Sequence, residues 1–206
     1  MRIITISREF GSGGRELGKR LAEHLGFDYY DREIIAAIAA EEGLDENYVE
    51  KAIDSEAWRS VPLTFRQSLS GAAVMQMPST ELLLAQKRVI DRIAASGRDC
   101  VIVGRNADVF LADHKPFHIF VCADTDAKVR RCLERAEAGE APTRRELVRK
   151  MRRIDRNRAE TRNILTGTPW GVRGTYHLTV NTSGWEIKEL TPAVAEFALR
   201  FFGRKQ

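Results

Sequence analysis

Three glycines and a serine stand close together near the amino terminus, in the order Gly11-Ser12-Gly13-Gly14. Glycine lets backbone N–H groups turn inward and lets phosphate oxygens approach where a Cβ would block them. A helix that begins at such a loop adds a partial positive charge of about half a unit at its N-terminus. These residue types at this spacing predict a phosphate cradle. The alternative is a tight strand-to-helix turn that binds no ligand.

Two standard phosphate-binding motifs fit this loop incompletely. The dinucleotide fingerprint GxGxxG needs a third glycine where Glu16 stands. In the P-loop motif GxxxxGK[ST], Gly13 takes the second glycine, so Gly14 stands at the lysine and Arg15 at the Ser/Thr. Guanidinium groups bind phosphate oxygens bidentately, so Arg8 and Arg15 are the candidates for the missing positive charge. The motif residue that would hold magnesium is absent.

Residues 144–162 form a second chemically distinctive stretch, with nine Lys/Arg and three Asp/Glu. If this stretch is one helix, Arg149, Arg153, Arg156 and Arg158 cannot share one face. From the residues alone, a solvated helix face and a nucleic-acid-binding surface are the two interpretations of this stretch. No base-stacking aromatic residues are interleaved with the arginines, which counts against nucleic acid.

Composition narrows the class of protein without naming a ligand. The chain has 206 residues and a net charge of +4, which is compatible with anionic partners. Its three cysteines lack metal-ligand spacing, so we expect neither a zinc site nor a disulfide framework. No apolar run approaches 18 residues, and the N-terminus does not resemble a signal peptide. We therefore expect a cytoplasmic protein without a membrane partner.

Apolar periodicity predicts strands that alternate with helices, which is typical of an α/β fold with a parallel sheet covered on both faces. Asp31 is the expected N-cap of the second helix, and residues 55–80 read as an irregular or partly helical insertion. The expected strands are 2–7, 100–104, 117–123 and 177–182. The expected helices are 15–25, 31–42, 45–54, 80–96, 126–138, 143–163 and 185–203.

Several ordered stretches resemble bacterial cytidylate kinases, and most closely the cytidylate kinase-like family, whose loop reads S-R-x-x-G-S-G-G. The opening stretch is ITISREFGSGGRELGKRLAEHLG. It is followed by GFDYYDREII, SGRDCVIVGRNADVFL, FHIFVCADTDAKVRRCLER, RRIDRNRAETRNILTGTPWG and YHLTVNTSGW. The likeness covers most of the chain except about residues 44–80. It implies one P-loop NTPase-type domain over 1–206, with a parallel sheet flanked by helices, a helical acceptor-side insertion at about 44–96 and a basic lid at about 143–172.

The resemblance also implies an activity: ATP-dependent phosphorylation of a nucleoside monophosphate, with CMP or dCMP expected, with ATP and Mg²⁺ bound and no nucleic-acid partner. The matching residues fall into three groups, and Arg162 is expected to join the lid arginines. The implied ATP-binding residues are Arg8, Gly11, Ser12, Gly13, Gly14 and Arg15. Arg15, Arg153 and Arg158 are the implied catalytic residues, and Asp31, Arg32 and Arg105 the implied acceptor-binding residues.

Two departures from the family pattern support a different hypothesis. Val103 stands where the usual kinase has an acidic residue, and the loop lysine is replaced by Gly14. Ser7 and Ser12 offer hydroxyl groups to magnesium, but nothing in the sequence secures that role. A nucleotide-binding regulatory protein with little or no turnover is therefore the alternative function.

Overall fold

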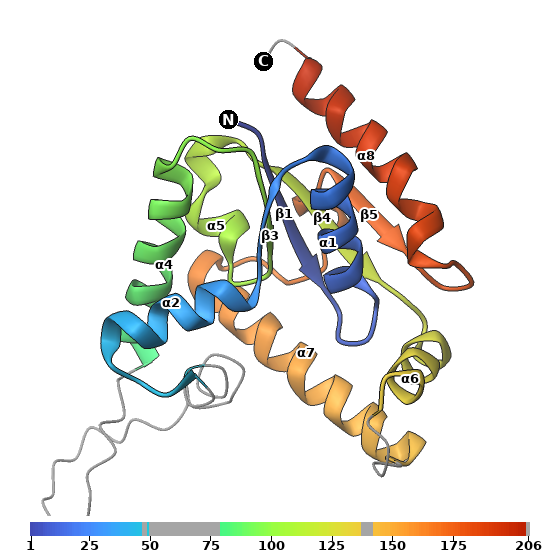
Figure 1. Ribbon diagram of the computed structural model, residues 1–206. Coiled ribbons are helices and arrows are strands. Elements are labelled where there is room, and N and C mark those ends of the chain that lie inside the picture. Colours follow the sequence, from blue (N-terminus) through green and yellow to red (C-terminus); the bar gives the residue numbers. More distant parts are fainter. Residues whose placement is uncertain (47–48, 50–78, 137–141, 205–206) are drawn as a thin grey trace, which may run out of the picture.

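The computed structural model describes residues 1–46, 49, 79–136 and 142–204. Its centre is a parallel sheet in the order β2-β3-β1-β4-β5 (Figure 1). The strands are β1 (Ile3–Arg8), β2 (Asp28–Tyr30), β3 (Cys100–Val103), β4 (Phe117–Cys122) and β5 (Leu178–Asn181). The expected α/β architecture is confirmed. β2 was not among the expected strands, because its three residues are too few to show a periodic pattern.

Helices cover both faces of the sheet, as strands apolar on both sides require. α1 (Gly14–Leu25) and α8 (Ile187–Gly203) pack together on one face (Figure 1). α2 (Arg32–Glu42), α4 (Ser79–Ala95) and α5 (Ala107–Phe110) cover the other. α4 falls within the stretch expected as an insertion, yet its apolar side chains belong to this core layer. The expected helix 45–54 and the irregular stretch 55–80 lie mostly outside the described residues.

A third group of elements lies at the carboxyl ends of the strands. α6 (Thr125–Glu134) follows β4, and α7 (Arg144–Thr166) crosses this end of the sheet (Figure 1). Val129 of α6 packs against Leu147 and Met151 of α7. Two single turns of 3₁₀ helix, Ala112–His114 and Arg173–Thr175, complete the elements of the described residues. In the ranges that the structure describes, no helix combines the length and the apolar character of a membrane span.

The register of the strands brings their following loops together. Ile6 lies opposite Val103 of β3, and Arg8 lies opposite Val121 of β4. The loop after β1 is therefore flanked by the chain that leaves β3 and the chain that leaves β4. Ligand sites in parallel sheets form at this edge, where neighbouring loops diverge.

Candidate active site

The loop between β1 and α1 folds tightly upon itself. Gly13 adopts a left-handed conformation with φ 83°, and a Cβ there would lie 2.5 Å from Cδ1 of Ile187. Only glycine satisfies both conditions. The buried Ser12 hydroxyl donates to the Glu9 carbonyl at 2.9 Å. The donor of that hydroxyl is therefore used inside the loop.

A pocket of about 550 Å³ opens above this loop, and the start of α1, α6 and α7 form its walls. The first N–H groups of a helix lack intrahelical acceptors, so α1 presents donors here. Seven of the residues implied by the family resemblance line this pocket, and Ser12 does not. They are Arg8, Gly11, Gly13, Gly14, Arg15, Arg32 and Arg158.

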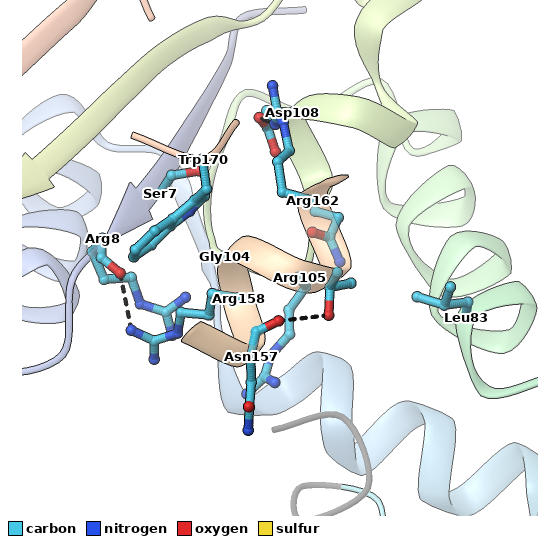
Figure 2. A pocket seen from close by; sticks show the side chains of 12 residues that line it. Ser7, Arg8, Leu83, Gly104, Arg105, Asp108, Asn157, Arg158, Arg162 and Trp170 are labelled. Atoms are coloured by element: carbon cyan, nitrogen blue, oxygen red, sulfur yellow. Dashed lines mark hydrogen bonds and ion pairs between the residues drawn. The ribbon is translucent and has the colours of Figure 1, made fainter. Parts of the chain in front are cut away.

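A second, smaller pocket adjoins the first and is lined by four arginines (Figure 2). Its volume of about 50 Å³ is small, which suits one phosphate group rather than a nucleobase. Ser7 and Trp170 also line it, and the Trp170 ring packs edge-on against Phe120 at 5.2 Å. The four arginines are Arg8, Arg105, Arg158 and Arg162.

The backbone after β3 is held in an unusual conformation. Gly104, Arg105 and Asn106 have φ values of 72°, 59° and 53°, so three successive residues are left-handed. For arginine and asparagine this conformation costs free energy, and such strain concentrates at functional sites. The buried side chain of Gln86 donates from Nε2 to the Arg105 carbonyl at 2.6 Å. The Arg8 guanidinium also fills the space that a Cβ on Gly104 would occupy.

Asp31 connects two of the loop arginines. Its carboxylate is almost fully buried, pairs with Arg15, and lies 3.6 Å from Nη2 of Arg8. Asp31 does stand at the N-cap position of α2, as expected, but its side chain makes no capping hydrogen bond there. The reason is electrostatic: a buried carboxylate is stabilised more by two guanidinium groups than by one backbone N–H.

Crowding of positive charge is strongest around Arg8. Burial lowers the pKa of the Arg8 guanidinium to about 9. The positive charges of Arg158, Arg105 and Arg15 lower it as well, and Asp31 opposes them. A cluster whose cations outnumber the adjacent carboxylates favours the entry of an anion.

α7 contributes arginines selectively to this cluster. Arg158 donates from Nη1 to the Arg8 carbonyl at 2.9 Å and contacts Asp155 Oδ1 at 3.2 Å. Arg162, one turn further, is buried and paired with Asp108 of α5. Arg153 does not join them: it is exposed and lines a separate outer surface of α7.

The spacing of residues along α7 indicates which of its arginines face the pockets. Leu147 and Met151 are the buried apolar residues of α7. Positions seven and eleven after Met151 lie on the same face, and they are Arg158 and Arg162. Arg153 falls on the opposite face. Asp108 was missed, because a carboxylate within the apolar stretch ADVF reveals its partner only in the folded chain.

Comparison with known proteins identifies a family. Residues 3–184 match the model of the cytidylate kinase-like family. A cytidylate kinase from Afipia carboxidovorans is 32% identical over 153 residues, which are 68% of this chain and 71% of that protein. A cytidylate kinase from Rhodopseudomonas palustris is 30% identical over 181 residues, 81% and 84% of the two chains.

A solved structure supports the fold independently. The shikimate kinase from Acinetobacter baumannii, in complex with shikimate, superposes with a TM-score of 0.55 at 12% identity, covering 98% of this chain and 94% of that one. At this identity the likeness concerns the fold alone, which is that of a P-loop kinase. The match over residues 3–184 shows that this chain belongs to the cytidylate kinase-like family.

Proposed function

We propose that this protein transfers the γ-phosphoryl group of ATP to a nucleoside monophosphate, with CMP or dCMP as the acceptor. One observation carries the proposal: Arg8 and Arg158 line both the large pocket above the glycine loop and the small arginine-lined pocket. A group passed from a donor in one pocket to an acceptor phosphate in the other crosses between these two guanidinium groups.

The donor belongs in the large pocket. The N–H groups at the start of α1 and the Arg15 side chain face the β- and γ-phosphates there, and the loop glycines admit the phosphate oxygens closely. Arg15 leaves Asp31 as the phosphates arrive, because a doubly charged phosphate attracts it more strongly than one carboxylate does. Arg15 thereby takes over the charge that lysine supplies in the usual motif.

The acceptor's phosphate belongs in the small pocket. Arg105 and Arg162 grip it, and the left-handed turn at Gly104–Asn106 holds Arg105 in place. Arg32 lines the large pocket, and Asp31 pairs with Arg15, which lines it too. Both contact the acceptor from the side of α2. The choice of CMP or dCMP among monophosphates rests on the two cytidylate kinases that share about a third of their residues with this chain.

Magnesium fits this site only as a partner of the nucleotide. The described residues hold no group of three His, Cys, Asp or Glu side chains that could cage a metal ion. Mg²⁺ in kinases keeps several waters and needs only one or two carboxylates beside the phosphates. The buried Oδ1 of Asp31 has no hydrogen-bond partner among those residues, so it is the oxygen that would approach the ion or its water. When bound, Mg²⁺ neutralises charge on the β- and γ-phosphates.

The residues of this chain then act by position and charge. Phosphoryl transfer needs alignment of acceptor oxygen, phosphorus and leaving oxygen, together with positive charge around the transferring group. Arg8 and Arg158 supply that charge where the pockets meet, and Arg15 stabilises the leaving ADP. α7 lies over both pockets and excludes the water that would otherwise hydrolyse ATP.

A coupled assay of ADP release tests this function. Purified protein with Mg-ATP is offered CMP, dCMP, UMP and AMP in parallel, with shikimate as an acceptor outside the nucleotide class. We expect ADP formation that depends on a monophosphate and is fastest with CMP or dCMP. Tight binding of Mg-ATP without acceptor-dependent ADP would favour the regulatory alternative, which the replaced lysine and Val103 motivate.

A further inference from the structure

The glycine loop is held by two buried polar side chains outside the loop itself, one of which also lines the large pocket. Thr182 follows β5, and Arg131 belongs to α6. The Thr182 hydroxyl, which is fully buried, donates to the Ser12 carbonyl at 2.7 Å. The same hydroxyl accepts from Nη1 of Arg131 at 2.9 Å. Three segments distant in sequence therefore meet at the carbonyl of Ser12.

The Arg131 guanidinium group donates its hydrogen bonds to neutral oxygens. Its second terminal nitrogen donates to the carbonyls of Thr182, at 2.6 Å, and Trp185, at 3.1 Å, and its first lies 3.4 Å from the Ser12 carbonyl. The side chain is 8% exposed and forms no ion pair with a carboxylate in the described part of the chain. Burying a cation in this way is costly, and a methionine or leucine would fill the space more cheaply. The cost indicates a role beyond packing.

The geometry of the peptide bond connects this network to the ligand side of the loop. The Ser12 carbonyl and the Gly13 N–H belong to one planar trans peptide group, so they point in opposite directions. Anchoring the carbonyl to Thr182 and Arg131 therefore turns the Gly13 N–H away from them. Gly13 lines the large pocket, and no acceptor among the described residues takes its N–H.

We propose that Thr182 and Arg131 are positioning residues that orient the Ser12–Gly13 peptide so that the Gly13 N–H faces the phosphates of ATP. The assignment of ATP to this pocket rests on the function proposed above. A conformationally permissive glycine loop has no intrinsic preference for one orientation of this peptide. The β5–α8 turn and α6 impose the orientation that the loop itself does not specify.

Three variants separate positioning from stability. Thr182→Val preserves shape and removes the hydroxyl, whereas Thr182→Ser keeps the hydroxyl. Thr191→Val is the matched control, because Thr191 is also buried and its hydroxyl also donates to a carbonyl, that of Ile187 within α8. For each variant, the affinity for a non-hydrolysable Mg-ATP analogue, the KM for ATP and for CMP, and the urea midpoint are measured.

We expect Thr182→Val to bind the analogue about tenfold more weakly, which corresponds to one lost charge-assisted hydrogen bond. The KM for ATP should rise by a similar factor while the KM for CMP stays within twofold. Thr182→Ser should lie within twofold of the wild-type protein throughout. Thr191→Val should lower the urea midpoint without changing nucleotide affinity. Equal nucleotide affinity in Thr182→Val and the wild-type protein would overturn the proposal, and so would an equal loss in Thr191→Val.

A readout without nucleotide distinguishes failure of this inference from failure of the proposed function. The backbone amide NMR signal of Gly13 should shift or broaden in Thr182→Val but not in Thr182→Ser or Thr191→Val. If the wild-type protein forms no ADP with any monophosphate, the kinase proposal fails. The Gly13 signal then still tests the positioning role, because it is measured without nucleotide. An unperturbed Gly13 signal in Thr182→Val refutes the positioning role even if the kinase is active.

Discussion

Replacement of Arg158 by alanine tests most directly whether phosphoryl transfer takes place where the two pockets meet. Arg158 lines both pockets. Under the proposed function, the substitution therefore removes positive charge from the point where the transferring phosphoryl group carries most developing charge. Loss of one preorganised donor of this kind costs about 10²–10³-fold in kcat, or roughly 3–4 kcal/mol of transition-state stabilisation. The bond from Arg158 to the Arg8 carbonyl, at 2.9 Å, is lost too, which adds about 1 kcal/mol through a less ordered Arg8. We therefore expect kcat to fall by at least about 10²-fold, with the KM for CMP changed by less than tenfold.

Steady-state kinetics of ADP release, with ATP and CMP varied in turn, measure this split. Arg156→Ala is the matched control, because it removes an arginine from the same helix on its exposed outer face. Arg158→Lys retains a charge without the planar fork and should recover only part of kcat. A kcat within tenfold of wild type for Arg158→Ala, or an equal fall for Arg156→Ala, would refute the assignment of the transfer site.

Three further predictions follow from the site and its supports. In the same assay, Arg105→Ala should raise the KM for CMP by about 10–100-fold and leave the KM for ATP within twofold. The reason is that Arg105 lines the small pocket and not the large one. A rise in the KM for ATP alone would contradict this prediction. Asp108→Ala should lower the free energy of unfolding in urea by about 3–5 kcal/mol, because it leaves the buried cation of Arg162 without its partner. Asp108→Leu combined with Arg162→Met should recover most of the loss. A fall below about 1 kcal/mol in Asp108→Ala would show that the ion pair is unimportant for stability. Burial lowers the pKa of His118 to about 4, so the folded state favours neutral imidazole. The stability that this group contributes above about pH 6.5 should therefore decline as the pH falls towards 4. Urea unfolding of His118→Gln should show less of this decline, and identical pH profiles of the variant and the wild-type protein would be evidence against it.

Local signals were sufficient for the framework of the fold. The β-branched stretch before Gly11 and the leucines at four-residue intervals after it predict a strand, a loop and a helix, and β1 and α1 follow that order. Such patterns are readable because strand and helix periodicity reflects which side chains are buried on each element. Gly13 was also readable, since a left-handed backbone at a crowded turn admits glycine alone.

Partnerships between distant residues were not readable in the same way. Asp31 had the position of an N-cap, but its carboxylate turns to Arg8 and Arg15. Arg153 and Arg158 are both arginines of one basic helix, and only Arg158 reaches the pockets. Arg153 and Arg158 have the same side chain and the same charge, so which of them reaches the pockets depends on how α7 is rotated against the elements beneath it.

The sequence by itself determined that a glycine loop lies at the first turn of a parallel α/β sheet, because glycine spacing and apolar periodicity are local properties of the chain. Only the tertiary structure decided which side chains surround that loop. Packing of α7 on α6 selects Arg158 and Arg162, and the turn after β5 brings Thr182 to the carbonyl of Ser12. The physical reason is that a buried charge or hydroxyl is stabilised by whichever partner folding brings within hydrogen-bond distance, and sequence separation says nothing of that distance.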